Sequence, residues 1–206
     1  MLLLEVCGNR AEQHECKGLC EQATLYGIET ICKAVKDNND LESILSSNDG
    51  LDYIYLSAHG CAESFESEDA AVKMEWYEFA GYLCTYNCLR EDGILMLSCC
   101  RGGLMQIAYE LFESCSQISY VLGPRQALSP IDMLTCFSVF LYNIEQRGLD
   151  PVVACEKIKC ATDQRFSCYD RQEEEVSIAN YNATYYISAI YDRIHQKVDQ
   201  EVDGDS

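Results

Sequence analysis

The chain has 206 residues, of which 48% are hydrophobic, and its 34 acidic and 15 basic residues give a formal net charge of −19. This length favours a single domain, and this hydrophobic content argues against an intrinsically disordered chain because it is enough to bury a sizeable core. A surface with this much negative charge repels phosphate backbones and anionic lipids. We therefore expect neither a nucleic-acid nor a membrane partner.

Short apolar runs alternate with helix-like segments along the chain, a pattern typical of a mostly parallel α/β sheet. In the first part of the chain, the pattern predicts strands at 2–7, 29–35 and 52–58 and helices at 11–26 and 41–45. Asp40 is the expected N-cap of the second of these helices. The polar and acidic residues at 61–71 predict a loop.

The second part of the chain continues the alternation, with helices predicted at 76–87 and 104–115 and strands at 94–98 and 118–122. Ser129-Pro130 and Asp150-Pro151 each predict the start of a helix, because a capping side chain precedes a proline at the first helical position. A further strand is predicted at 183–190. We expect one domain over 1–195 and an acidic, disordered tail over 196–206.

The sequence contains fourteen cysteines, and their oxidation state depends on the cellular compartment of the protein. The first residues carry too short an apolar run and too little positive charge for a signal peptide, and no apolar stretch approaches the roughly 20 residues that span a bilayer. We therefore expect a cytoplasmic protein whose reduced thiols pack as small hydrophobic side chains. No CxxC pair occurs, so the sequence predicts no metal site, and it predicts no other cofactor.

Two neighbouring strands of the predicted sheet end in residues that suit nucleophilic chemistry. The strand at 52–58 is followed by His59-Gly60, and the strand at 94–98 by Cys99-Cys100. Because active sites in open parallel sheets gather beyond the carboxyl ends of the strands, we expect His59 and Cys100 to lie close together. An imidazole can take the proton of a thiol, and the N–H of Gly60 could face a developing oxyanion. Taken alone, each residue also fits a surface histidine or an inert cysteine.

The same residues resemble those of a known family. Residues 53–60 resemble the histidine motif of caspase-like peptidases, and residues 97–102 are similar to their Gln-Ala-Cys-x-Gly signature. Segments 121–123, 137–148 and 150–161 are similar to the closing part of CHAT domains, the bacterial relatives of caspases, so that the resemblance covers residues 1–165. It implies a three-layer α-β-α sandwich around a mostly parallel sheet of about six strands.

The resemblance also implies a reaction and roles for the residues. It implies a cysteine endopeptidase that hydrolyses a protein or peptide substrate, with Cys100 as nucleophile and His59 as general base and acid. The backbone N–H groups of Gly60 and Cys100 would form the oxyanion hole. Because neighbouring side chains of a strand point to opposite faces, Cys99 is expected to be buried when Cys100 faces the site.

The chain departs from the family pattern where substrate is selected. Ser98 stands where caspases carry a glutamine and metacaspases an aspartate, so neither an acidic nor a basic preference is implied. Arg10 is placed like a caspase specificity arginine, although a solvated loop arginine is the alternative interpretation. We retain Ser98 and Arg10 as candidate substrate-binding residues.

Three functions fit these features: an active peptidase, a catalytically degenerate caspase-like module that binds a partner, and an α/β domain that binds a small molecule. His59, Gly60 and Cys100 favour the first over the second. No glycine-rich phosphate loop follows the first strand, which disfavours the third. An activating partner protein or a homodimer would supply regulation. The CHAT resemblance suggests a role in bacterial immunity, such as antiviral defence, or in cell death.

Overall fold

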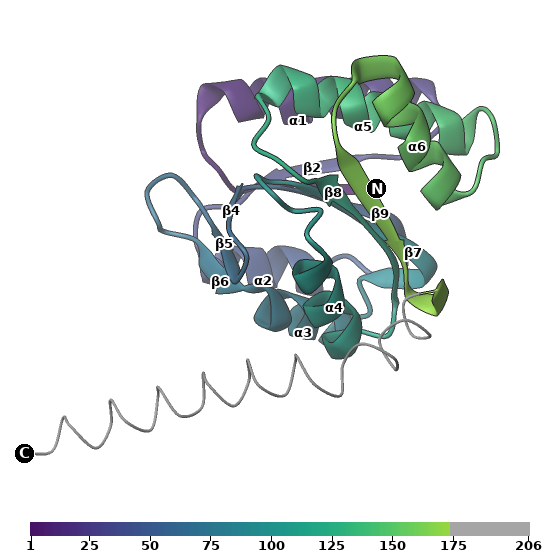
Figure 1. The fold of residues 1–206 in the computed structure, drawn as a ribbon. Coiled ribbons are helices and arrows are strands. Elements are labelled where there is room, and N and C mark those ends of the chain that lie inside the picture. Colours follow the sequence, from purple (N-terminus) through teal and green to yellow (C-terminus); the bar gives the residue numbers. More distant parts are fainter. Residues whose placement is uncertain (174–206) are drawn as a thin grey trace, which may run out of the picture. The chain divides into compact units, whose positions relative to one another are not determined.

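The computed structural model describes residues 1–173 (Figure 1). Internal contacts divide the chain into a compact unit, Met1–Asp170, and a second unit, Arg171–Ser206. All of the helices and strands given below belong to the first unit. The strand predicted at 183–190, the domain end predicted at 195 and the tail predicted at 196–206 lie outside the described residues.

The first unit is built around a six-stranded sheet with the strand order β2-β1-β3-β7-β8-β9. Every neighbouring pair in this sheet is parallel except β8 and β9, which are antiparallel. The predicted α/β fold with a mostly parallel sheet is therefore confirmed. Its strands are β1 (Leu2–Glu5), β2 (Ile31–Ala34), β3 (Leu51–Ser57), β7 (Leu89–Ser98), β8 (Ile118–Pro124) and β9 (Phe166–Asp170).

Helices cover both faces of this sheet, with α1, α5 and α6 on one face and α2, α3 and α4 on the other (Figure 1). The parallel connections require this arrangement, because each crossover helix returns the chain to the same end of the sheet. The helices are α1 (Arg10–Leu25), α2 (Asn38–Ser46), α3 (Trp76–Thr85), α4 (Met105–Ser114), α5 (Pro130–Glu145) and α6 (Pro151–Thr162).

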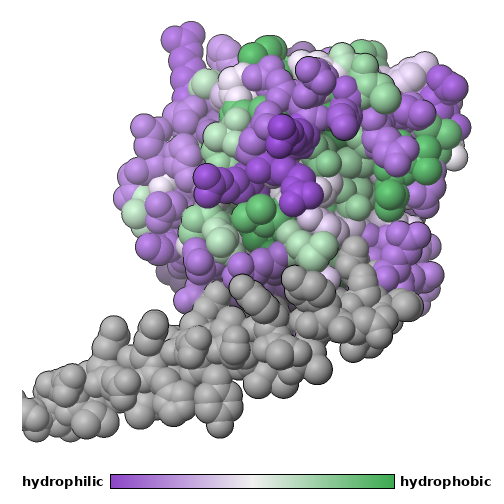
Figure 2. All heavy atoms as spheres, viewed as in Figure 1, coloured by the Kyte–Doolittle hydropathy of each residue, from purple (hydrophilic) through white to green (hydrophobic). Residues whose placement is uncertain are grey.

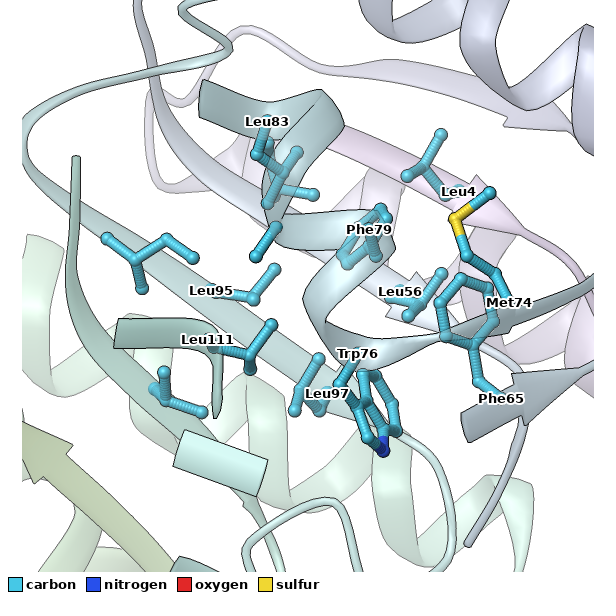
Figure 3. Packing of buried hydrophobic residues seen from close by; sticks show 14 of the residues in the cluster. Leu4, Leu56, Phe65, Met74, Trp76, Phe79, Leu83, Leu95, Leu97 and Leu111 are labelled. Carbon is cyan, nitrogen blue, oxygen red and sulfur yellow. The ribbon is translucent and has the colours of Figure 1, made fainter. Parts of the chain in front are cut away.

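The central strands divide their side chains between two hydrophobic clusters, one on each face. In β3, Ile54 and Leu56 belong to the cluster beneath α3 and α4, whereas Tyr53 and Tyr55 belong to the cluster beneath α1 and α5. Figure 3 shows the first cluster, where leucines of the central strands meet aromatic residues of α3 and its neighbours. Burial on both faces explains why β7 contains the nearly continuous apolar run at 94–98.

The segment predicted as a loop at 61–71 contains part of a small antiparallel sheet, and that prediction is wrong. Its strands are β4 (His59–Gly60), β5 (Ser64–Glu66) and β6 (Lys73–Glu75), in that order. In β5, a single buried residue, Phe65, lies between polar residues, and its ring is 5.2 Å from those of Trp76 and Phe79. A strand of three residues gives too little alternation to stand out in the sequence.

Two further details differ from the sequence predictions. The N-cap of α2 is Asp37, whose Oδ1 accepts a hydrogen bond from the Asp40 N–H at 2.8 Å, so the helix begins earlier than predicted. The last strand of the sheet is β9, which was not predicted. Its sequence, Phe-Ser-Cys-Tyr-Asp, is too short and too mixed in polarity to distinguish a strand from a loop.

The surface is largely polar. Polar side chains cover most of the face seen in Figure 2, and apolar groups gather between them in patches. None of the helices within residues 1–173 is long and apolar enough to cross a membrane.

Candidate functional site

His59 and Cys100 follow two neighbouring parallel strands at the same level. Ser57, the last residue of β3, is the register partner of Ser98, the last residue of β7. Each candidate residue lies two positions beyond its strand, and the Ala58 N–H continues the ladder by donating to the Ser98 carbonyl at 3.2 Å. The carboxyl ends of β3 and β7 therefore bring the two segments together as expected.

The chain turns sharply directly after β7. The Gly102 N–H donates to the Cys99 carbonyl at 3.0 Å, and Arg101 has a φ of 63°, which is uncommon for a residue other than glycine. Cys100 is half-buried in this turn, and its backbone N–H donates no hydrogen bond to another described residue. The turn thus places at the carboxyl edge of the sheet a half-buried cysteine whose N–H has no backbone partner within residues 1–173.

Glycines allow the backbone to pass closely around this turn. A Cβ at Gly103 would lie 2.1 Å from the Gly123 carbonyl oxygen, and the Gly103 N–H donates to the Pro124 carbonyl at 2.8 Å. A Cβ at Gly60 would lie 2.8 Å from the Cys99 Cβ. The His-Gly segment can therefore lie directly against the Cys99-Cys100 segment only because residue 60 has no side chain.

Cys99 is buried, as the alternation of strand side chains predicts. Only 1% of its surface is exposed, and its Sγ lies against the backbone of Gly60 and Gly102. Burial in apolar surroundings raises the pKa of the Cys99 thiol, and the nearby Cys100, Glu15 and Cys61 raise it further. Cys99 is therefore a protonated packing residue rather than a ready nucleophile.

His59 is exposed, and its ring lies beside residues that the sequence did not single out. A ring nitrogen of His59, the Cys7 Sγ and a Glu12 carboxylate oxygen all lie within 4.8 Å of one another. No hydrogen bond joins His59 to Cys100 within residues 1–173. Because β1 is the neighbour of β3 in the sheet, Cys7 also follows a strand at this carboxyl edge. The strand-end argument applied to β1 would have included Cys7.

Cys7 is less suited than Cys100 to act as a nucleophile. Burial raises the pKa of the Cys7 thiol, and the carboxylates of Glu12 and Glu15 raise it further. Only 1% of Cys7 is exposed, so an extended substrate reaches Cys100 more readily. Of these two thiols, Cys100 is the more accessible, because it is half-buried whereas Cys7 is almost fully buried.

Ser98 and Arg10, the two candidate substrate-binding residues, have different surroundings. Ser98 is 5% exposed, and its hydroxyl donates to the carboxylate of Glu15 in α1, which also accepts from the Tyr55 hydroxyl. Arg10 is exposed at the first residue of α1. Because Ser98 is buried and bonded to Glu15, it could influence a substrate only indirectly, together with Glu15. Arg10 is exposed and could contact a ligand from the solvent.

Glu15 is a buried acid in this network. Burial raises its pKa from the ordinary 4.5 to about 7, although the hydrogen bonds from Ser98 and Tyr55 oppose the shift. Between pH 4.5 and about pH 7, the folded protein keeps a proton on Glu15 that the unfolded chain has already released. The contribution of Glu15 to the free energy of unfolding therefore falls as the pH rises through this range.

Glu15→Gln should remove this pH dependence. A shift of this size corresponds to about 3 kcal/mol, so from pH 4.5 to pH 7.5 the mutant should gain up to that much free energy of unfolding relative to the wild type. Urea unfolding of both proteins across this range measures the difference. A constant difference between the two proteins would contradict a buried, titrating Glu15.

A cavity of about 460 Å³ opens beside Cys7 at the same edge of the sheet. It is lined by Val6, Cys7, Gly8, Val35, Lys36, Ser67, Glu68 and Asp69. Its acidic lining residues, Glu68 and Asp69, belong to the acidic segment that follows β4. One of them, Asp69, already accepts from the Ser67 hydroxyl and the Ala71 N–H, so part of this acidity shapes the β5–β6 connection.

Comparison with known proteins identifies no family for this chain. The chain matches no model of a protein family, and no curated protein matches it.

Proposed function

We propose that the chain is a cysteine peptidase in which Cys100 is the nucleophile and His59 the general base and acid. One observation supports this proposal above all. The two residues lie the same number of positions beyond the paired ends of adjacent parallel strands, and Cys100 is half-buried in the turn there. The burial of Cys99 leaves Cys100 as the accessible thiol of the adjacent pair.

In the proposed reaction, His59 accepts the proton of the Cys100 thiol, and the thiolate attacks the carbonyl carbon of a peptide bond. The resulting oxyanion accepts hydrogen bonds from backbone N–H groups, of which that of Cys100 has no other partner among the described residues. Collapse of this intermediate breaks the C–N bond, and His59 protonates the leaving amine. Water activated by His59 then hydrolyses the thioester and restores the thiol.

The second candidate is a caspase-like module that binds a partner without cutting it. It is favoured by the lack of a hydrogen bond between His59 and Cys100 in the described chain. Such contacts are often long before substrate binds, so this geometry does not by itself exclude catalysis. Incubation with a peptide library and sequencing of the products separates the two functions, because only a peptidase yields cleavage products that disappear in Cys100→Ser.

Basic peptides are the substrate class that the charge favours. The chain carries a net charge of −19, and Glu68 and Asp69 line the cavity beside the site. Opposite charges accelerate association and raise the local concentration of a ligand. The resemblance to CHAT domains supports an immune or cell-death setting in the cytoplasm, with regulation by a partner protein or a second copy.

The active enzyme is expected to be one uncut chain. Caspases are commonly activated by cleavage of a linker between the nucleophile strand and the next strand. Here α4 (Met105–Ser114) occupies about half of that connection, and only short segments join it to β7 and β8. Several residues of α4 are fully buried, including Ile107 and Leu111, so a cut there would expose core surface. Intact-mass measurement of active protein should give the full-length mass. Two fragments divided between Cys100 and Ile118 would contradict this expectation.

A further inference from the structure

Three potential metal ligands meet at the carboxyl edge of the sheet. A ring nitrogen of His59, the Cys7 Sγ and a carboxylate oxygen of Glu12 lie within 4.8 Å of one another. They come from three separate elements, since Cys7 follows β1, Glu12 is in the first turn of α1, and His59 begins β4. The sequence showed no metal site because these residues have no recognisable ligand spacing.

A second observation points to a cation at this place. The Glu12 Oε2 atom is buried and receives no hydrogen bond of ordinary geometry from the described residues, so the weakly donating Cys7 thiol beside it is the one group that acts on this carboxylate there. A thiol is only a weak hydrogen-bond donor, so it compensates a buried carboxylate oxygen poorly, and a bound cation would compensate it better. The position of Glu12 is itself held, because its N–H donates to the Asn9 Oδ1 at 3.1 Å.

We infer that Cys7, Glu12 and His59 bind a divalent transition-metal ion, zinc above all. A thiolate, an imidazole and a carboxylate together are typical zinc ligands, whereas magnesium and calcium prefer oxygen ligands alone. Ligand atoms of a tetrahedral zinc lie about 3.3–3.7 Å apart, given the usual bond lengths. Closing the observed cluster to that spacing requires a movement of about 1 Å, which the exposed His59 side chain can make by rotation.

The ion would also regulate the proposed peptidase, and this consequence rests on the proposed function. A ring nitrogen that donates its lone pair to a metal cannot accept the proton of Cys100. Zinc at this site therefore inhibits turnover, and Cys7 and Glu12 hold the inhibitor without taking part in the reaction. The binding itself does not depend on whether the chain cleaves peptides.

Cobalt binding tests the site directly, because a thiolate ligand to Co²⁺ gives a charge-transfer absorption band. The full-length protein, kept reduced with a phosphine, should bind one Co²⁺ with this band, and zinc but not magnesium should displace it. Cys7→Ser should lose the band. Glu12→Gln and His59→Ala should weaken binding at least about 10-fold, since even outer-shell changes have effects of that size.

Matched variants control for the other thiols and imidazoles. Cys32→Ser and His14→Ala remove an exposed cysteine and an exposed histidine outside the cluster, and both should bind Co²⁺ like the wild type. A band that survives in Cys7→Ser, or equal weakening in the control variants, would overturn the site. If Cys7→Ser does not fold, cobalt binding by Glu12→Gln and His59→Ala still tests the site. Neither of these side chains belongs to the buried core, so both variants should fold.

The regulatory consequence has its own measurement. Zinc should inhibit turnover by the wild type. The zinc concentration that halves the rate should be at least about 10-fold higher for Glu12→Gln, when each protein is compared with its own metal-free rate. Activation by zinc, or loss of activity with a chelator, would overturn the inhibition. Cys100→Ser should keep cobalt binding, so failure of the peptidase proposal and failure of the metal site give different results.

Discussion

Cys100→Ser should reduce peptide cleavage by at least about 10⁴-fold, to the level of the buffer blank, because loss of a catalytic nucleophile removes the covalent step altogether. The serine hydroxyl is nearly the same size as the thiol, and Cys100 lies half-buried in a turn, so the fold should tolerate the change. Rates of product formation from a library-derived peptide, measured beside thermal unfolding, test this expectation.

Cys99→Ala is the matched control for that experiment. Cys99 is buried against Gly60 and Gly102, so its loss should reduce the free energy of unfolding by about 1 kcal/mol. Cleavage should continue, since the Cys99 thiol is buried and its pKa is raised, so that it stays protonated. If Cys99→Ala were inactive and Cys100→Ser active, the two cysteines would have exchanged roles, and every contact assigned to this turn would need revision.

His59→Ala should lower kcat by about 10²–10⁴-fold while leaving the fold intact. The expected loss is that of one acid–base group, and the side chain is exposed, so it contributes little packing. Circular dichroism and urea unfolding should match the wild type. His14→Ala, which removes an exposed histidine of α1, should keep full activity. Normal turnover by a folded His59→Ala protein would instead indicate a surface histidine without a catalytic role.

Much of the fold could be predicted because its elements carry strong local signals. Strand β7 is apolar on both faces, and α5 and α6 each begin with a capping side chain followed by proline. The edge strand β9 and the hairpin of β5 and β6 were missed. These strands have three to five residues, and long-range pairing rather than local preference determines their conformation.

The candidate site could be predicted only in part. His59 and Cys100 are visible in the sequence because each lies two residues beyond a strongly apolar strand. Cys7, Glu12 and Glu15 were missed, because their closeness to the site depends on β1 lying next to β3 and on the rotation of α1 over the sheet. A single sequence contains neither the strand order nor that rotation. The environment of Ser98 could not be foreseen for the same reason, since Glu15 reaches it across 83 residues.

The most direct test of the proposed function is to find which of the fourteen cysteines reacts with a peptidyl electrophile. A pool of peptidyl acyloxymethyl ketones with varied residues at the cleaved position should add one label per chain, and peptide mapping by mass spectrometry should place it on Cys100. The label should fall sharply in His59→Ala, because the thiolate needs the imidazole. Labelling of Cys7 or Cys99, or labelling that simply follows exposure at Cys32, Cys61 and Cys160, would contradict the proposal.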